Sequence, residues 1–367
     1  MKTAELLRER LQLVYRWYRG MVNPDSRMFE YLYFPQTDTF VHEKSPIRDI
    51  ASVWDAEVLS DFLSRYELRP LIENSLRYYG DYLVEREGYL ILDPRRLEEP
   101  SSIAHSAFMI LALLHAPPPR RTQQISALAQ GILRQQRSDG SYKVYFHDLP
   151  DEGEELYAGE AMLALLETYR QLKDTRYLQS VECAFSYYDR QYFQHARVAE
   201  NILVFFANWQ SQACRLLFEC TQSAEIKQDI TDYVCRMHDQ IIQQDFYENI
   251  EHHPTQQVSV EIACALEGLN DAYALASASS DKRAKHYHHY ICTGLAYLLK
   301  LQCTHNGTEK ERGGFGLSLE NRMQRIDISG HAASAFMKSM ENGIECQLPV
   351  RLTTSVRKKE SYPIRRE

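Results

Sequence analysis

Six stretches of the chain share one hydrophobic pattern, in which a polar residue leads an apolar helix with small side chains on one face. The clearest runs from Tyr157 to Tyr169. Aligned by their apolar cores, the six stretches place the following residues in one column: Asp55, His105, Glu160, Gln212, Glu261 and His331. Successive members are 50, 55, 52, 49 and 70 residues apart. Such a period predicts an array of helical hairpins, and the small residues predict close helix contacts in an inner ring.

Helical periodicity extends over most of the chain and predicts twelve helices, with column helices and other helices alternating. The expected helices are 3–20, 50–65, 68–85, the His105 helix that Pro117–Pro119 ends, 121–136, the Glu160 helix, 175–192, 202–221, 224–244, 257–275, 283–302 and 328–342. Short strands are expected in a hairpin of 28–34 with 39–42, and at 88–93, 141–146 and 313–319.

The connections between helices differ in length according to which helix they enter. Those that lead into column helices are long, at about 21–49, 86–101, 137–156, 245–256 and 303–327. Those that leave column helices are mostly very short. In an alternating antiparallel ring, the long connections all lie on the face where the column helices begin. Because variable loops on a rigid scaffold commonly carry function, we expect a site at that mouth.

Two local motifs carry a family resemblance. Gln135–Tyr142 has the helix end, turn and strand, and Gly159–Leu166 the inner-helix start, that are found in many six-hairpin α/α toroids. The chain resembles that superfamily, which includes glycoside hydrolases, sugar epimerases, and prenyltransferase and terpene-cyclase barrels. The resemblance implies an all-α (α/α)6 toroid over 3–342, with short β-hairpins in the loops of one face. Residues 343–367 are expected to form a basic, flexible tail.

Composition and charge narrow the class of protein. No apolar run approaches the ~18 residues that a membrane span needs, and the charged N-terminus is unlike a signal peptide, so we expect a cytoplasmic protein that does not enter a membrane. The net charge of −8 argues against a nucleic-acid partner. The eight cysteines show no CxxC pairing, which predicts reduced buried thiols rather than disulfides or zinc ligands. No metal or cofactor is expected.

Three column residues are carboxylates: Asp55, Glu160 and Glu261. Glycosidic chemistry uses paired carboxyl groups across a cleft, one protonated to donate to the leaving oxygen and one ionised to activate water or to attack. The helix dipole favours the ionised form of such a group, and burial favours the neutral form. A purely structural role stays open for each, because carboxylates are common at helix starts.

The densest polar cluster that enters a column helix is Ser329-Gly-His331, with Arg325 and Asp327 just before it. Asp327 lies four residues before His331, close enough to orient its imidazole for acid/base catalysis. Arg325 is a candidate clamp for a sugar carboxylate or phosphate. In the alternative reading, Asp327 is an N-cap and the His331 side chain is satisfied inside the ring.

Further residues of the mouth loops and helix starts are of the types that bind sugars. His253 is among them rather than a metal ligand, because it follows His252 directly, adjacent histidines point in different directions, and no third ligand is evident. The expected substrate-binding residues, besides Arg325, are His105, Lys143, Tyr145, Tyr157, Asn208, Trp209, Gln212, His253 and Phe315. Trp54, Phe108 and Phe205 can equally be plain core.

These features predict a carbohydrate-active enzyme that hydrolyses, eliminates from or epimerises a sugar, with acid/base candidates Asp55, Glu160, Glu261, Asp327 and His331. Two alternatives remain: a biosynthetic toroid that handles an isoprenoid or other small metabolite, and a non-catalytic toroid that binds a peptide or protein. A cavity ringed by carboxylates and hydroxyls favours the sugar. An aliphatic and aromatic cavity favours the metabolite, and a shallow or plugged mouth favours the non-catalytic protein.

Overall fold

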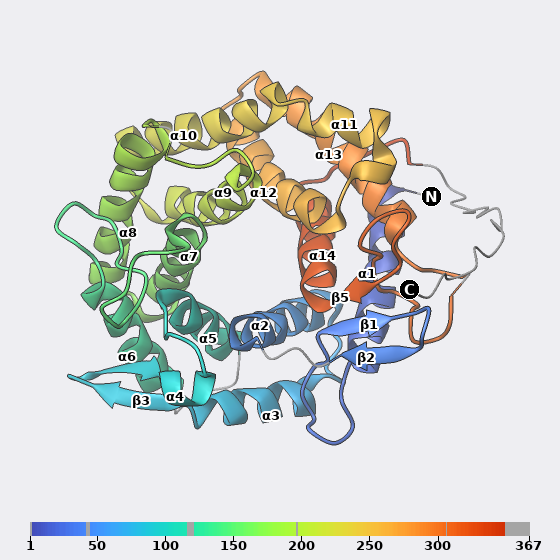
Figure 1. Cartoon of the computed structure of the whole chain (residues 1–367). Helices are drawn as coiled ribbons and strands as arrows, with labels where there is room; N and C mark the ends of the chain where they lie inside the picture. Colours follow the sequence, from blue (N-terminus) through green and yellow to red (C-terminus); the bar gives the residue numbers. More distant parts are fainter. Residues whose placement is uncertain (1, 42–44, 116–120, 196, 306, 349–367) are drawn as a thin grey trace, which may run out of the picture.

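The protein consists of two concentric rings of helices (Figure 1). The computed structural model describes residues 2–41, 45–115, 121–195, 197–305 and 307–348. The inner ring is α2 (Pro46–Leu63), α5 (Ile103–His115), α7 (Glu154–Leu172), α9 (Leu203–Cys220), α12 (Ser259–Ala278) and α14 (Ile326–Glu341). The outer ring is α1 (Thr3–Gly20), α3 (Arg69–Gly80), α6 (Arg121–Arg134), α8 (Thr175–Tyr187), α10 (Ala224–Gln243) and α13 (Arg283–Leu301). The predicted (α/α)6 toroid is confirmed.

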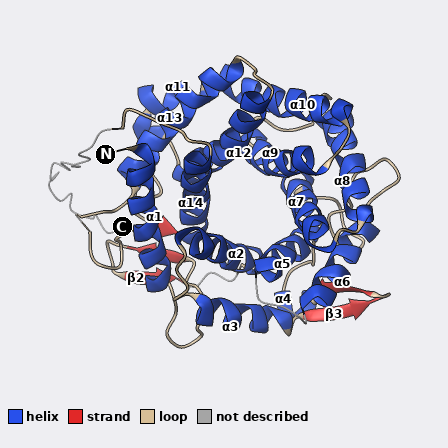
Figure 2. Cartoon of the chain, turned by 180° about the vertical axis from the view of Figure 1, so that it is seen from behind, coloured by secondary structure: helices blue, strands red, loops and turns tan. Residues whose placement is uncertain are grey.

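The inner helices are buried on nearly all sides, and each contacts the next around the ring, with α14 against α2 closing it (Figure 2). α5, for example, is buried continuously from Ile103 to Leu113. Small residues permit these contacts: a Cβ on Gly159 of α7 would lie 2.6 Å from the Cβ of Trp209 on α9. Such a distance is far inside van der Waals contact, so the close approach predicted from the small residues is confirmed.

Short strands lie in the connections that precede inner helices. β1 (Leu32–Phe34) pairs antiparallel with β2 (Thr39–Val41) and with β5 (Gln324–Arg325), so the predicted hairpin gains a third strand from the segment before α14. β3 (Leu83–Arg86) and β4 (Tyr89–Leu92) form a second hairpin, and therefore the helix predicted over 68–85 ends at Gly80. The remaining short elements are α4 (Pro94–Leu97), η1 (Tyr188–Phe193), α11 (Phe246–His252) and η2 (Pro254–Gln256).

Two predicted strands are wrong. The segments 141–146 and 313–319 make only isolated bridges, such as Gln136 with Tyr142 and Gln302 with Phe315. Each has alternating apolar residues because one side packs on the ring, but neither has a neighbouring strand long enough to form a ladder. His42 and Pro117–Pro119, which the sequence places at the end of a strand and of a helix, lie outside the described residues.

A disulfide joins Cys292 of α13 to Cys346, so the expectation that all cysteines are reduced is wrong. The backbone carbonyl of Cys346 also accepts a hydrogen bond from Thr3 Oγ1 at 3.2 Å. Residues 343–348 are therefore fastened between α1 and α13 rather than being part of a flexible tail, and 349–367 lie outside the described residues. Disulfides are typical of oxidising compartments, so the cysteines no longer support a cytoplasmic location.

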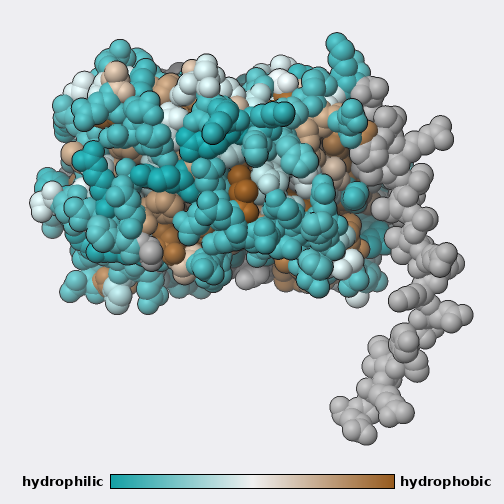
Figure 3. All heavy atoms as spheres, turned by 90° about the horizontal axis from the view of Figure 1, so that it is seen from above, coloured by the Kyte–Doolittle hydropathy of each residue, from teal (hydrophilic) through white to brown (hydrophobic). Residues whose placement is uncertain are grey.

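The outer wall visible in Figure 3 is mostly hydrophilic, with hydrophobic residues scattered over it. Within the described ranges, every helix is too short or too polar to serve as a membrane span.

Replacing both Cys292 and Cys346 by serine should lower the free energy of unfolding by about 2–4 kcal/mol, because the bond closes a 54-residue loop that includes α14. Urea unfolding followed by circular dichroism measures the change. Cys183→Ser, at an exposed free thiol, is the control and should leave the midpoint unchanged. Equal midpoints for all three proteins would show that the crosslink does not stabilise the ring.

Candidate functional site

A cavity of about 590 Å³ lies at the N-terminal ends of the inner helices, on the face that carries the long loops. We call it the front cavity. Its aromatic wall consists of Trp54, Phe108, Tyr157, Phe205 and Trp209. Its ionisable groups are Arg48, Asp55, Glu99, Glu160, Glu267, Arg325, Asp327 and His331. The volume is in the range of pockets that enclose a small ligand.

His331 and Glu267 form the central ion pair of the front cavity, with His331 Nδ1 2.8 Å from Glu267 Oε2. Burial on its own would lower the pKa of His331, but Cys264 and Glu267 raise it well above the ordinary value. Burial likewise opposes ionisation of Glu267, yet its hydrogen bond with His331 leaves the pKa of that carboxyl below its usual value. The pair is therefore an imidazolium and a carboxylate. Asn208 Nδ2 donates to the same Glu267 oxygen at 3.1 Å and helps to hold this carboxylate in place.

Asp327 has a different role from the predicted one. It does not hydrogen-bond to His331; its carboxylate accepts two hydrogen bonds from the Arg325 guanidinium, and Tyr31 Oη donates to it at 3.3 Å. Arg48 Nε lies 3.7 Å from the same carboxylate. Burial would raise the pKa of Asp327, but Arg325, His331 and Arg48 hold it below the usual range. Asp327 is not the N-cap either, because α14 begins at Ile326.

Glu160 is a buried carboxyl group with an unused oxygen. Its side chain belongs to α7 and lines the front cavity, and Oε2 has no hydrogen-bond partner among the described residues. Burial raises the pKa of Glu160 to about 8, although the positive charge of His331 works to lower it. Glu160 therefore holds its proton at neutral pH, at the wall of the front cavity.

Asp55 lies deeper in the ring, on the α2 helix. Burial raises its pKa to about 7; His331 works to lower it, and the carboxylates of Glu267 and Asp327 raise it further. A Cβ at Gly330 of α14 would overlap the Asp55 carboxylate, so the closing contact of the ring is made against this group. Asp55 can therefore exist in either protonation state near neutral pH.

His105 lies behind Glu99, a cavity residue that the sequence analysis did not single out. The backbone N–H of Ser102 donates to His105 Nδ1 at 3.2 Å, so that nitrogen is an acceptor and carries no proton. The proton is then on Nε2, which donates to Glu99 Oε1 at 3.0 Å. His105 is buried, contacts Glu99 and does not itself line the front cavity.

The column residues do not share one depth, and this corrects the predicted single ring of side chains. His105 and Glu261 are the third residues of their helices, and Asp55 and Gln212 are the tenth. At 1.5 Å per residue the difference is about 10 Å along the helix axis. Glu261 consequently lies above the front cavity and does not line it, and Gln212 lines a second cavity at the opposite end.

The remaining predicted substrate-binding residues also fall into two groups, those that line the front cavity and those that do not. Tyr157, Trp209 and Arg325 line the front cavity. Asn208 is one layer behind it, against Glu267. The other four do not line the front cavity. Lys143 pairs with Asp148 at 3.5 Å, and Tyr145 lies in the loop near Glu99. His253 is exposed, and Phe315 is fully buried against Phe336. Phe315 is core because its strand-like segment packs inward, against α14.

The sequence analysis missed Arg48, Glu99 and Glu267. Glu267 did leave a signal, since it is the one charged residue in the apolar run from Ile262 to Leu269. Arg48 lies in the first turn of α2, and Glu99 precedes α5. At such positions apolar periodicity does not indicate which way a side chain points. Trp54, Phe108 and Phe205, for which a core role was equally open, all line the cavity.

The fold has many counterparts among solved structures. An unsaturated glucuronyl hydrolase from Bacillus sp. GL1 is 12% identical, with a TM-score of 0.65 over 92% of this chain and 97% of that chain. A D-mannose isomerase is 12% identical, with a TM-score of 0.66 over 92% and 97%. A family 76 mannosidase from Bacteroides thetaiotaomicron is 9% identical, with a TM-score of 0.62 over 92% and 99%. No protein-family model and no curated protein matches the sequence.

The chain thus has the α/α toroid fold of the six-hairpin type. At such low identity the likeness concerns the fold, and the chemistry has to be argued from the side chains of the front cavity.

The raised pKa of Glu160 predicts a pH effect on stability. The folded state holds this proton up to about pH 8, whereas the unfolded chain releases it near 4.5. The resulting stabilisation is fully present below pH 4.5 and is lost as the pH rises through about 8. Glu160→Gln cannot lose a proton, so at pH 9 it should be more stable than the parent protein by on the order of 3–5 kcal/mol.

Urea unfolding at pH 5 and pH 9 measures this difference. The exposed Glu225→Gln variant is the matched control and should track the parent protein at both pH values. A Glu160→Gln variant that also tracks the parent at both would mean that Glu160 is ionised at neutral pH.

Proposed function

We propose that the protein is a carbohydrate-active enzyme that processes a sugar in the front cavity by acid/base chemistry. The observation that carries the proposal is Glu160: a buried carboxyl group in the lining of the front cavity that keeps its proton at neutral pH and, among the described residues, has an oxygen without a partner. A general acid needs these properties, because it must deliver a proton to a reacting oxygen from a site that excludes water.

Asp55 is the proposed base, since its pKa of about 7 lets it accept a proton and release it again. Glu160 donates its proton to the leaving oxygen or to the ring oxygen, and the Asp55 carboxylate takes one from the attacking group. If Asp55 takes the proton from water, the reaction is hydrolysis. If it takes the proton from a carbon of the sugar, the reaction is elimination or epimerisation. The His331 imidazolium, held in place by Glu267, lies close enough to influence both carboxyl groups.

The walls of the cavity support a sugar substrate. Trp54, Tyr157 and Trp209 offer faces on which sugar rings can stack. Arg48 and Arg325 line one side of the cavity, beside the Asp327 carboxylate. Guanidinium groups suit an anionic substituent on the sugar, such as a carboxylate. Proteins of similar architecture are named as hydrolases, isomerases and epimerases of sugars, which agrees with this assignment.

The two rival functions receive less support. An isoprenoid needs a cavity lined by aliphatic and aromatic groups, whereas eight acidic or basic side chains line this one. A non-catalytic binding protein needs no protonated, buried carboxyl group in the wall of a cavity of about 590 Å³.

A thermal-shift screen of neutral and anionic mono- and oligosaccharides, followed by product analysis of each hit, tests the proposal and identifies the reaction. For a substrate found in this way, Glu160→Gln should keep the KM and lower kcat at least about a hundredfold, because the amide preserves shape but has no proton to donate. Asp55→Asn should have a comparable effect.

Glu261→Gln separates the cavity from the neighbouring helix starts. Glu261 is also an inner-helix glutamate with a pKa raised by burial, but it does not line the front cavity, so kcat should change less than about threefold. Normal turnover by both Glu160→Gln and Asp55→Asn would refute the proposed chemistry, and a loss in Glu261→Gln alone would place the site nearer the loops.

A further inference from the structure

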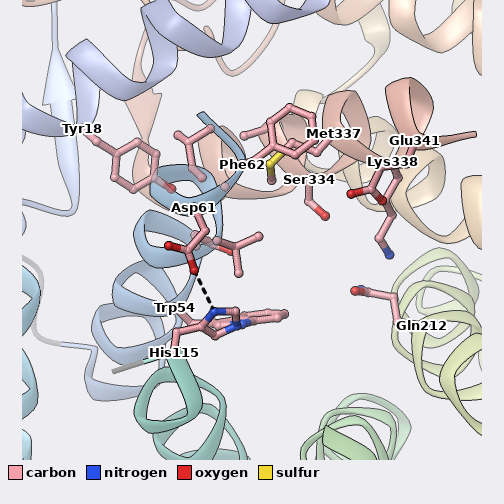
Figure 4. Close-up of a pocket in the computed structure, with 15 residues that line it drawn as sticks. Tyr18, Trp54, Asp61, Phe62, His115, Gln212, Ser334, Met337, Lys338 and Glu341 are labelled. Carbon is pink, nitrogen blue, oxygen red and sulfur yellow. Dashed lines mark hydrogen bonds and ion pairs between the residues drawn. The ribbon is translucent and has the colours of Figure 1, made fainter. Parts of the chain in front are cut away.

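A second cavity, of about 350 Å³, lies at the other end of the ring, between the C-terminal halves of α2 and α14 (Figure 4). We call it the rear cavity. Val58, Phe62 and Met337 form apolar walls. Gln212 and Lys338 also line it, and the Lys338 ammonium donates to Asp271 Oδ2 at 2.6 Å. Its rim is polar and open to solvent: the Asp61 side chain is 53% exposed and pairs with His115, itself 35% exposed, at 3.3 Å.

The front and rear cavities meet at Asp55. Among the described residues, only Trp54 and Asp55 line both. Asp55 is the tenth residue of the 18-residue helix α2, which places it midway through the ring. Gly330 faces its carboxylate from α14, and a glycine leaves no side chain to cover the group on the rear side.

The rear cavity differs from the front one in what it can hold. The paired arginines belong to the front cavity, whereas Val58, Leu59 and Gly330 line the rear cavity near Asp55. A cavity of this size has room for several water molecules, and Asp55, Gln212 and Ser334 offer them hydrogen-bonding groups.

The rear cavity offers Asp55 a second path to solvent, which the proposed chemistry requires. A sugar bound in the front cavity separates Asp55 from solvent on that side, yet a base must release each proton that it accepts before the next turnover. We propose that Asp55 exchanges its proton with bulk water through the rear cavity while the substrate occupies the front cavity.

This proton route rests on the proposed function, in which Asp55 acts as the base. The Asp55 carboxylate accepts one proton from the reacting water or carbon in the front cavity. The protonated carboxyl group then passes one proton to a water molecule in the rear cavity, and the hydronium ion leaves past Asp61 and His115. The ionisable groups that influence the Asp55 charge are Glu267, on α12, and Asp327 and His331, on α14. No redox partner is required.

Access to position 55 can be measured without any substrate. In Asp55→Cys, labelling of the new thiol by methyl methanethiosulfonate is followed by peptide mass spectrometry, which resolves it from the native cysteines. Val260→Trp narrows the front cavity, and Val58→Trp, the matched change, narrows the rear one. The expected result is rapid labelling with the front plug alone and at least tenfold slower labelling with both plugs.

Two results would overturn the proposal: loss of labelling with the front plug alone, or equal labelling rates with one plug and with both. Circular dichroism establishes that each variant is folded. If Val58→Trp is not, Ala333→Phe narrows the rear cavity from α14 and replaces it.

Steady-state kinetics provide a second test of the proton route. For a substrate identified by the screen, Val58→Trp in the otherwise native chain should lower kcat at least tenfold, leave KM unchanged, and increase the solvent deuterium isotope effect, because proton release becomes limiting. A change in KM with unchanged kcat would contradict the route. If no sugar is turned over, the proposed function fails, while the labelling result still decides whether the rear cavity reaches Asp55.

Discussion

The ring depends on the contact that closes it, where the last hairpin meets the first. α14 can approach α2 only because residue 330 is a glycine, and the group that it packs against is the carboxylate of Asp55. Burying a carboxyl group at the seam of a helical ring is unfavourable unless it is protonated or compensated by nearby charge. The closing contact of the fold therefore also creates a group whose pKa is shifted toward neutrality.

One positive charge organises the electrostatics around this seam. His331 is held as an imidazolium by Glu267, and it influences the pKa values of Asp55, Glu160 and Asp327 alike. The outcome differs among the three carboxyl groups because their other neighbours differ. Asp327 has two arginines beside it and stays ionised, whereas Glu160 has no hydrogen-bond partner at Oε2 in the described part of the chain and stays protonated. Carboxyl groups with opposite protonation in one cavity are the usual basis of acid/base catalysis at neutral pH.

A toroid differs from most enzyme folds in having two open ends. The long connections surround one end and leave the other to short turns, such as residues 173–174 and 221–223. The N-terminal halves of the inner helices thus provide the walls of the front cavity, and the C-terminal halves provide those of the smaller rear cavity. Asp55 belongs to both because it lies at the midpoint of its helix.

The sequence by itself determined the number of hairpins, the membership of the inner ring and the face that carries the long loops. Apolar periodicity reports which side of a helix faces inward, and small residues such as Gly159 report close packing. The same pattern does not change when a helix slides along its axis by one turn, about 5.4 Å. Only the tertiary structure decided that Glu267, and not Glu261 or Asp327, meets His331. Only it brought Cys292 to Cys346, because contacts between residues distant in sequence depend on how all six hairpins pack together.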